Sequence, residues 1–370
     1  MSDHRILIIA DIQSVHTVRW ASSLSKRGWD VTVLSVTAGS LDGVRVLHSD
    51  PGQPSDQRLV RWGKQLIFLL RQLWAQMTGK YDIVHVHFLR ADLIPVIATW
   101  HPVSVISLWG SDVKTAEEGA YTRWERFPRY ALLNASAVTA TNDFLASRGK
   151  QKAGQDVTVK VIPFGVDQTE FYSAQVNRKQ NAVITFCFGK GSLIKTYAPD
   201  ILLTAFARVV KQLPNAHLLM TGAVVDDFGL ETVQMVETLG LKDKVTLLGR
   251  LNHKEMLELY RKSDIYVQAS RWESFGVAGL EALACGTAVI VTYVGGVGSL
   301  FTDRENALIV QPNDPIQLAT AMLELAVDHR LRMKLIENGQ KMVQDKYNWE
   351  DNVSQMILLY NNILQGKPIG

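Results

Sequence analysis

Short runs of β-branched and aliphatic residues alternate along the chain with longer segments in which apolar residues recur every three or four positions. The runs occupy positions 5–11, 30–36, 82–88, 103–110 and 137–142 in the first half, and 183–189, 216–222, 245–250, 264–270 and 288–294 in the second. Helical periodicity follows them, for instance over 14–28, 199–212 and 253–262. Parallel strands that alternate with helices have this pattern, so the sequence predicts an α/β fold.

The alternating pattern breaks once, near the middle of the chain. The residues VIPFGVD at 161–167 are followed by a polar stretch, after which a second alternating series begins. We therefore predict two Rossmann-like, doubly wound parallel-sheet domains, the first over 1–170 and the second over 171–348. A last amphipathic segment is long enough to cross back, so 349–370 is assigned to the first domain. Because ligands of such sheets bind at the carboxyl ends of the strands, we expect the active site in a cleft between the domains.

Composition narrows the class of protein. The chain has 370 residues, of which 47% are hydrophobic and 20% charged, with a formal net charge of +3. This composition supports buried cores and excludes an intrinsically disordered chain, and the small charge argues against nucleic-acid binding. Cys187 and Cys285 lie far apart in apolar stretches, so neither a disulfide framework nor a zinc site is expected. Without a signal-peptide pattern or an apolar run of roughly 20 residues, we expect a cytoplasmic protein.

One stretch carries most of the candidate chemistry, RWESFGVAGLEALACG at 271–286. Its two glutamates, Glu273 and Glu281, are separated by just over two helical turns, and a helix is expected to begin near Gly276. Exposed N–H groups at such a helix start bind anions, and a glycine lets a ligand approach the backbone. The residues therefore fit a diphosphate flanked by hydroxyl-bearing sugars, although an ordinary amphipathic helix would show the same spacing.

The same stretch, read on as ESFGVAGLEALACGTAVI, resembles the signature of family-four glycosyltransferases (GT4), in which seven residues separate two glutamates. Further segments resemble that family: WGSD at 109–112, KVIPFGVD at 160–167, GKGSLIKTYAPDILLTAF at 189–206 and VTLLGRLNHKEMLELYRKSDIYVQAS at 245–270. The resemblance implies the GT-B fold, with the nucleotide-sugar donor in the second domain and the acceptor in the first. It implies a retaining, metal-independent hexosyltransferase of polysaccharide or glycolipid biosynthesis.

The resemblance also implies roles at the donor site. Glu281 would hydrogen-bond the nucleotide ribose, and Glu273 would read the hydroxyls of the transferred sugar. Lys195 and Lys190 would neutralise the diphosphate, which gains charge as the glycosidic bond breaks. Further donor contacts would come from Arg250 beside the base and from the backbone N–H groups of Ser274, Phe275, Gly276 and Val277.

The first domain departs from the family pattern at two places. The loop that opens it reads DIQSVHTVRW where the family is often glycine-rich, and His16 either reaches the mouth of the cleft or lines the helix. Trp109 stands where the family usually has a cleft histidine, so we expect a flat apolar wall there, with Asp112 receiving an acceptor or sugar hydroxyl. Turnover is still expected, because in a retaining transfer the leaving diphosphate can take the acceptor proton. The candidate catalytic residues are Glu273, Lys195, Asp112 and His16.

No metal or other cofactor is expected. The sequence has no Asp-x-Asp pair and no histidine cluster with metal-ligand spacing. His85 and His87 alternate on one strand and face the same way, which we interpret as a structural pair beside the cleft. The nucleotide-sugar is a co-substrate, and UDP, the nucleotide most common among the family's donors, is the default.

Two other kinds of protein fit the same fold. A GT-B relative that binds nucleotide-sugar without turnover would keep the donor motifs, and Trp109 keeps this alternative open. A sugar-nucleotide epimerase or a phosphorylase would share the fold, although the sequence has no motif for a pyridoxal-phosphate lysine. The acceptor, whether a glycan, a lipid-linked sugar or a small molecule, is specified by no motif.

The segment 57–80 combines helical periodicity with basic charge. It contains five basic residues and no acidic one, and its apolar positions are Leu59, Trp62, Leu66, Leu70, Leu73 and Met77, with Trp74 beside them. Basic, tryptophan-bearing amphipathic helices lie in bilayer interfaces, so peripheral association with the inner face of a membrane is one prediction. The alternative is a helix that packs its apolar face on the core and exposes only its basic side.

Overall fold

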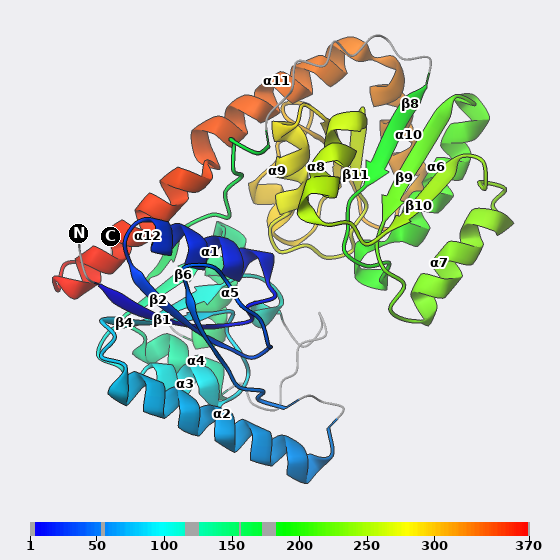
Figure 1. The fold of residues 1–370 in the computed structure, drawn as a ribbon. Coiled ribbons are helices and arrows are strands. Elements are labelled where there is room, and N and C mark those ends of the chain that lie inside the picture. The colour runs from blue at the N-terminus through cyan, green and yellow to red at the C-terminus, as the bar shows by residue number, and fades with distance from the viewer. Residues whose placement is uncertain (1–3, 53–55, 115–125, 155–156, 172–182, 369–370) are drawn as a thin grey trace. The chain divides into compact units, whose positions relative to one another are not determined.

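The computed structural model describes residues 4–52, 56–114, 126–154, 157–171 and 183–368. The chain divides into two compact units, one of Met1–Pro163 with Asp351–Gly370 and the other of Phe164–Glu350 (Figure 1). Each unit is built on a parallel sheet with helices packed against it, so the predicted α/β class with two doubly wound domains is confirmed.

Among the described residues, the first unit has a seven-stranded sheet in the order β3-β2-β1-β4-β5-β6-β7, with every pair parallel. Its strands are β1 (Arg5–Ala10), β2 (Asp30–Ser35), β3 (Arg45–His48), β4 (Ile83–His87), β5 (Ser104–Leu108), β6 (Ala137–Ala140) and β7 (Val159–Val161). Its helices are α1 (Val15–Lys26), α2 (Arg58–Thr78), α3 (Leu93–Ala98), α4 (Arg126–Asn134) and α5 (Asp143–Ala153), with the 3₁₀ turn η1 (Ser111–Val113). The strand order reverses between β1 and β4, which places a crevice after these two strands.

Within the part that the structure covers, the second unit has a six-stranded parallel sheet in the order β10-β9-β8-β11-β12-β13. Its strands are β8 (Ile184–Phe188), β9 (Ala216–Thr221), β10 (Val245–Gly249), β11 (Ile265–Gln268), β12 (Ala288–Thr292) and β13 (Leu308–Val310). Its helices are α6 (Pro199–Gln212), α7 (Asp227–Thr238), α8 (His253–Lys262), α9 (Val277–Ala284), α10 (Pro315–Val327) and α11 (His329–Lys346), with the 3₁₀ turns η3 (Lys195–Tyr197) and η4 (Gly295–Ser299). The order reverses between β8 and β11.

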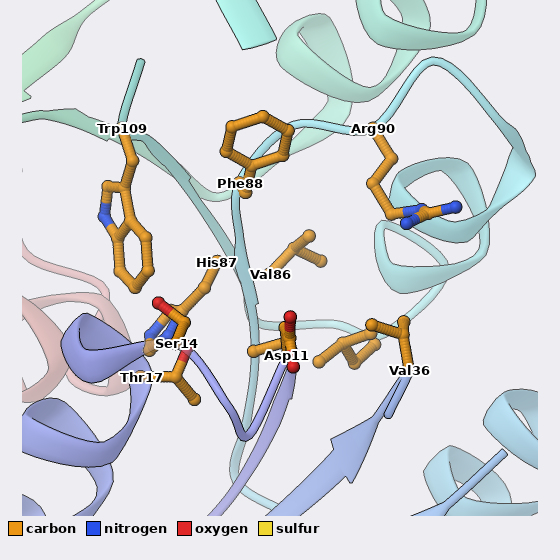
Figure 2. A pocket seen from close by; sticks show the side chains of 11 residues that line it. Asp11, Ser14, Thr17, Val36, Val86, His87, Phe88, Arg90 and Trp109 are labelled. Carbon is orange, nitrogen blue, oxygen red and sulfur yellow. The ribbon is translucent and has the colours of Figure 1, made fainter. Parts of the chain in front are cut away.

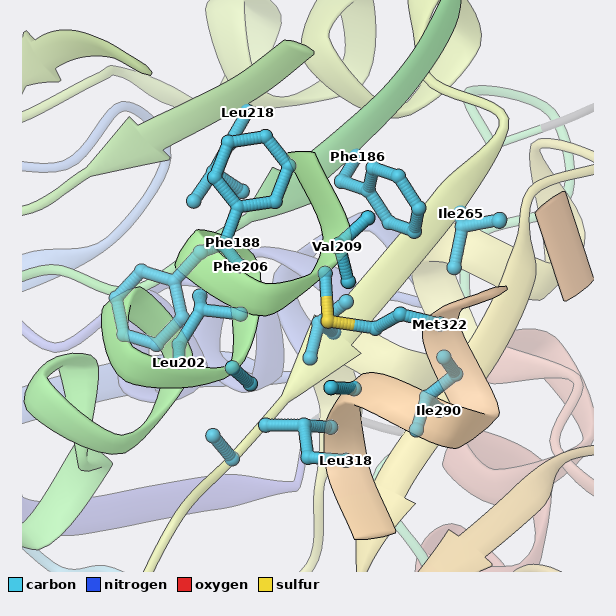
Figure 3. Packing of buried hydrophobic residues seen from close by; sticks show 14 of the residues in the cluster. Phe186, Phe188, Leu202, Phe206, Val209, Leu218, Ile265, Ile290, Leu318 and Met322 are labelled. Atoms are coloured by element: carbon cyan, nitrogen blue, oxygen red, sulfur yellow. The ribbon is translucent and has the colours of Figure 1, made fainter. Parts of the chain in front are cut away.

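The strand sequences explain why both sheets are covered on two faces. Central strands such as β1 and β12 are buried along almost their whole length and read as continuous apolar runs, as parallel sheets require. In the second unit, Phe186 and Leu218 from the sheet pack with Phe206 of α6 and Met322 of α10 (Figure 3). Burial of these large side chains holds the strand ends of the sheet in fixed positions.

The last helix, α12 (Trp349–Leu364), begins in the second unit and continues in the first. Tyr360 is completely buried in the first unit, where its hydroxyl lies 2.6 Å from Nδ1 of His85. Its ring also packs against Trp29, with 5.3 Å between the ring centroids. The C-terminal residues therefore complete the core of the first unit.

Candidate active site

Two charged side chains meet at the carboxyl end of the second sheet, where the strand order reverses. Lys190 follows β8 and Glu273 follows β11, and Nζ of the lysine lies 2.5 Å from Oε2 of the glutamate. Both side chains are largely buried, with 8% and 15% of their surface exposed. The same Nζ lies 3.4 Å from Oε1 of Gln268 and 4.9 Å from the centre of the Tyr197 ring. We refer to Lys190, Tyr197, Gln268 and Glu273 as the donor cluster.

Neighbouring backbone fixes the direction of Lys190. Its N–H donates to Oγ1 of Thr221 at 2.8 Å, and that hydroxyl lies 2.8 Å from the Lys190 carbonyl. The preceding residue, Gly189, has little room for a side chain, because a Cβ there would lie 2.7 Å from the Met256 methyl group. The lysine is therefore held where its ammonium group reaches Glu273.

A glycine turn fixes Glu273 in the same way. The N–H of Gly296 donates to the Glu273 carbonyl at 3.0 Å. Gly295 has a φ of 52°, and a Cβ there would lie 2.0 Å from the same oxygen, so any side chain at this position would displace the glutamate. Neither glycine was predicted as a site residue, because only the fold brings this turn, which follows β12, onto the motif.

The helix that follows Glu273 begins as the motif predicts. Gly276 has a φ of 91°, a conformation that favours glycine, and α9 starts at the next residue. A Cβ on Gly276 would lie 3.4 Å from Nε2 of Gln268, so the helix start adjoins the donor cluster. That Nε2 is buried and has no hydrogen-bond partner among the described residues. The predicted anion site at a helix start and the paired charges thus lie side by side.

Phe275 has a different part in this turn. Its ring is buried, with T-shaped contacts to Phe164 at 5.7 Å and to Tyr347 at 6.0 Å between centroids. The side chain therefore anchors the turn, and its backbone is the part left for a ligand. Ser274 and Val277 on either side are only partly buried.

The other predicted donor residues are placed differently. Glu281 is partly buried on α9, near enough that it adds to burial in raising the pKa of Tyr260. Arg250 follows β10 and is exposed. Lys195 lies in η3 with an exposed side chain, so Lys190 rather than Lys195 is the lysine in contact with Glu273.

Arg271 organises the loop beside the donor cluster and was missed as a site residue. Its guanidinium binds both carboxylate oxygens of Asp200, at 2.9 and 2.6 Å, and donates to the Lys195 carbonyl at 2.7 Å. Bidentate pairs of this kind are geometrically specific. Arg271 therefore ties the loop after β11 to the start of α6, and its position two residues before Glu273 was the available signal.

A pocket of about 290 Å³ lies in the first unit, where its own strand order reverses (Figure 2). Loops that follow β1, β2, β4 and β5 supply its walls. It is lined by Ile9, Ala10, Asp11, Ser14, Thr17, Val36, Val86, His87, Phe88, Arg90 and Trp109. We refer to it as the first-unit pocket. The expected cleft residue Trp109 is thus a pocket wall and not part of the core, and Asp11 is a lining residue that the motifs did not indicate.

The two candidate catalytic residues of the first unit, His16 and Asp112, are held by contacts within the protein. His16 packs edge-on against Trp109, 5.9 Å between centroids, and burial and then Arg19 lower its pKa to about 4. Asp112 is buried, and its carboxylate accepts the backbone N–H groups of Leu89, Trp109 and Gly110 at 3.0, 3.1 and 2.7 Å. Asp112 therefore anchors the loop that carries Trp109, and its expected role of receiving a substrate hydroxyl stays a prediction.

The two histidines of β4 have different surroundings, because one is hydrogen-bonded in the core and the other lines the first-unit pocket. His85 is completely engaged, with Nδ1 on the Tyr360 hydroxyl and Nε2 2.7 Å from Oγ of Ser107. His87 lines the first-unit pocket and packs on Trp109 with 4.4 Å between centroids. In the parts of the chain that the structure describes, no three His, Cys, Asp or Glu side chains gather as metal ligands would.

Acidification is expected to destabilise the first unit. Burial holds the pKa of His85 near 3 and of His16 near 4, and it lowers the pKa of His87 as well. The unfolded chain binds these protons near pH 6.5, so this stability is complete above about pH 7. It is lost as the pH falls from 6.5 toward 4, by about 1.4 kcal/mol per pH unit for each histidine. Urea unfolding at pH 7 and pH 5 measures it, and an unchanged pH dependence in His85→Gln would contradict the assignment.

Two family models match the chain. The model described as "Glycosyl transferases group 1" matches residues 168–342, and the model described as "Glycosyltransferase Family 4" matches residues 13–170. The first covers the donor cluster, and the second covers the residues of the first-unit pocket from Ser14 onward.

The chain is also similar to known glycosyltransferases and to a solved structure with UDP and glucose bound. The chain is 28% identical to a D-inositol 3-phosphate glycosyltransferase of Geodermatophilus obscurus, over 94% of this chain and 84% of that protein. It is 27% identical to a protein of the same name from Salinispora tropica, over 79% of this chain and 66% of the relative. The structure of Anabaena HepE in complex with UDP and glucose superposes with a TM-score of 0.80 at 17% identity, over 97% of this chain and 100% of that one.

Proposed function

This chain belongs to glycosyltransferase family four and has the GT-B fold, and from that premise we propose that it transfers a hexose from a nucleotide-sugar with retention of the anomeric configuration. UDP is the proposed nucleotide, supported by the similar fold of HepE, whose structure contains UDP and glucose. The proposed acceptor is a hydroxyl of a glycan, a lipid-linked sugar or a small molecule.

The observation that carries this proposal is the Lys190–Glu273 pair beside the start of α9. As the bond between the sugar and the diphosphate breaks, the leaving oxygen gains negative charge. Lys190 and the backbone N–H groups at the helix start would stabilise that charge. The incoming diphosphate would replace Glu273 as the partner of Lys190. Glu273 would then be released to accept a hydroxyl of the transferred sugar.

Retention removes the need for a side-chain base. The acceptor O–H bond breaks while its oxygen bonds the anomeric carbon on the face that the diphosphate leaves, and the proton passes to the departing phosphate oxygen. The lowered pKa values of His16 and His87 support neutral imidazoles behind Trp109. A tryptophan at this position is therefore compatible with turnover, since orientation and leaving-group stabilisation remain.

The direct test is nucleotide release from a broad panel of nucleotide-sugars, with and without a mixed pool of acceptors that includes lipid-linked sugars. Acceptor-dependent release together with a glycosylated product is the expected result. Tight donor binding with neither transfer nor slow hydrolysis would instead indicate a nucleotide-sugar-binding protein without turnover. Interconversion of donor sugars without an acceptor would indicate an epimerase.

Transfer is expected to continue in the presence of a chelator. Lys190 and the start of α9 supply positive charge for the diphosphate, which is the role that a divalent metal would otherwise fill. Initial rates with excess EDTA should stay within about twofold of those without it. A complete loss of activity that Mg²⁺ restores would contradict metal independence.

Helix α2 exposes an apolar face. Leu59, Trp62, Leu66, Leu70, Trp74 and Met77 share that face and have 57–88% of their surface exposed. The opposite side is buried at Phe68, Gln72 and Ala75, and Nε2 of Gln72 donates to the Ile94 carbonyl at 2.9 Å. The interpretation that this helix packs its apolar face on the core is therefore wrong. No helix among the described residues is long and apolar enough to cross a bilayer.

We also propose that α2 docks peripherally on the anionic inner surface of a membrane. Arg58 and Lys80 are exposed at the two ends of the apolar face, and anionic lipids complement such charges. Lys64 adds less to the attraction for anionic lipid than the sequence suggests, because Asp50 and Asp56 pair with its ammonium group at 2.9 and 3.1 Å. The two tryptophans of the face suit the headgroup region.

Vesicle flotation should detect this docking. The protein is expected to float with anionic vesicles at low salt and to stay behind with neutral ones. Trp62→Ser combined with Trp74→Ser should weaken binding by about tenfold or more. Ile316→Ser with Val327→Ser on α10, which are similarly exposed, is the matched control and should bind normally. Equal losses in both variants, or no binding to anionic vesicles, would contradict the proposal.

A further inference from the structure

The first-unit pocket combines an aromatic wall with a carboxylate. In Figure 2 the Asp11 carboxylate lies between the Trp109 indole and Val36, with Phe88 completing the apolar side. These residues follow four neighbouring strands, so a ligand in the pocket touches all four loops at once. The pocket's volume, about 290 Å³, is just below the range of about 300–1,000 Å³ for drug-sized ligand sites, which suits a ligand of one ring.

Asp11 lines this space, and its two carboxylate oxygens differ in their hydrogen bonds. Its Oδ1 accepts the Gln13 N–H at 2.9 Å and the Thr37 hydroxyl, which together fix the orientation of the carboxylate. Oδ2 accepts no hydrogen bond from a described residue. An acceptor-only oxygen of this kind is suited to a ligand that donates a hydroxyl.

Trp109 is held rigidly as a wall. The centroid of the tilted His87 ring lies 4.4 Å from that of the indole, and the centroid of the His16 ring lies 5.9 Å from it. Its backbone N–H is fixed by Asp112 at 3.1 Å. The negative face of an indole attracts the weakly positive C–H groups of a pyranose ring, and a fixed indole does so at little conformational cost.

The charges around the pocket favour an uncharged ligand. Arg90 is neutralised locally, because its Nε donates to Asp92 Oδ2 at 2.7 Å. His87 has a pKa well below 6.5 because it is buried, so it carries no positive charge near neutral pH. Asp11 is therefore the lining charge without a described ionic partner, and it repels anions.

We infer that the first-unit pocket binds an uncharged pyranose as the acceptor, stacked on Trp109 and donating a ring hydroxyl to Oδ2 of Asp11. This inference rests on the proposed transferase function and specifies the acceptor, a terminal sugar rather than a phosphorylated polyol. Free and lipid-linked glycans present the same ring, so the two sources share this chemistry.

Calorimetry and acceptor kinetics on the full chain test this, with methyl and octyl glycosides of common hexoses as neutral probes and inositol 3-phosphate as the anionic probe. Neutral glycosides are expected to bind and the anion to bind at least about tenfold more weakly. Equal binding of methyl and octyl glycosides indicates a free glycan acceptor, and tighter binding of the octyl forms indicates a lipid-linked one.

Variants identify the contacts. Trp109→Ala and Asp11→Asn should each raise the glycoside KM and Kd about tenfold, with Trp109→Phe intermediate and UDP affinity unchanged. Trp100→Ala is the matched control, because Trp100 is 59% exposed in the same unit and does not line the pocket. Thr37→Val removes the hydroxyl that donates to Oδ1 of Asp11 and lies near Ser35 Oγ, but it leaves Oδ2 unchanged, so it should have a smaller effect than Asp11→Asn.

Two outcomes would overturn the inference, namely glycoside binding that is insensitive to Trp109 and Asp11, and a preference for inositol 3-phosphate that Asp11→Asn strengthens. Trp109-dependent glycoside binding without any transfer would contradict the proposed function and leave the pocket assignment standing. Transfer to glycosides that is unaffected in Trp109→Ala and Asp11→Asn would contradict the pocket assignment and leave the proposed function standing.

Discussion

Glu273→Gln is expected to lower kcat about a hundredfold to a thousandfold while the affinity for UDP rises. The carboxylate is held at Lys190 in the structure and would move to the transferred sugar in the reaction, where an amide is a weaker acceptor. UDP lacks the sugar, so it loses nothing from the substitution. Its diphosphate no longer competes with the Glu273 carboxylate for Lys190, so the affinity for UDP should rise about fivefold.

Calorimetry with UDP and initial rates with donor and acceptor measure these two opposite effects in one variant. Ser270→Ala is the matched control, because Ser270 Oγ lies 3.4 Å from the same Oε2 and carries no charge. It should change both quantities by less than about threefold. A loss of UDP affinity in Glu273→Gln would mean that the glutamate contacts the nucleotide rather than competing with it.

Lys190→Gln is expected to weaken UDP binding about tenfold to a hundredfold and also to lower kcat. The charge that stabilises the diphosphate is lost, and Glu273, with 15% of its side chain exposed, is left without its cation. A mostly buried carboxylate left without its partner should lower the free energy of unfolding by about 1–3 kcal/mol. Urea unfolding measures that cost separately from binding.

The double variant Lys190→Gln with Glu273→Gln separates the two effects, since it should recover stability without recovering UDP affinity. Lys195→Gln is the comparison for the other lysine of the same loop, whose side chain is exposed. It should weaken UDP binding by only a few fold. A larger loss in Lys195→Gln than in Lys190→Gln would transfer the diphosphate role to Lys195.

The fold was predictable because its central strands are buried. All ten apolar runs form strands close to their expected bounds, α6 and α8 have the predicted limits, and α12 begins at the predicted residue. The strands that were not predicted, β3, β7 and β13, lie at sheet edges and span only three or four residues. Two of them, β3 and β7, have no fully buried residue, so they leave no continuous apolar run to detect.

The local geometry of the candidate site was predictable where it depends on residues that are close in sequence. Glu273 and the turn at Gly276 belong to one motif, and the structure has the helix start that the motif implies. Contacts between distant segments were not accessible, because spacing says nothing about which loop meets which. The contact of Lys190, rather than Lys195, with Glu273 and the place of Asp11 in the first-unit pocket both depend on such distant contacts.

Asp112 shows a different limit. A carboxylate after a strand has the same sequence signature whether it binds a ligand or anchors a loop, and only the three backbone donors around Asp112 distinguish these cases. The exposed face of α2 is a similar case, because helical spacing does not reveal which face is covered.

The central claim is that a sugar leaves its diphosphate at the Lys190–Glu273 site and keeps its anomeric configuration. Proton NMR of the product formed from an α-linked donor such as UDP-glucose, followed in the wild-type protein and in Glu273→Gln, tests it most directly. The expected product is α-linked, and it should form about a hundredfold or more slowly in the variant. A β-linked product, or an α-linked one that Glu273→Gln forms at the wild-type rate, would contradict it.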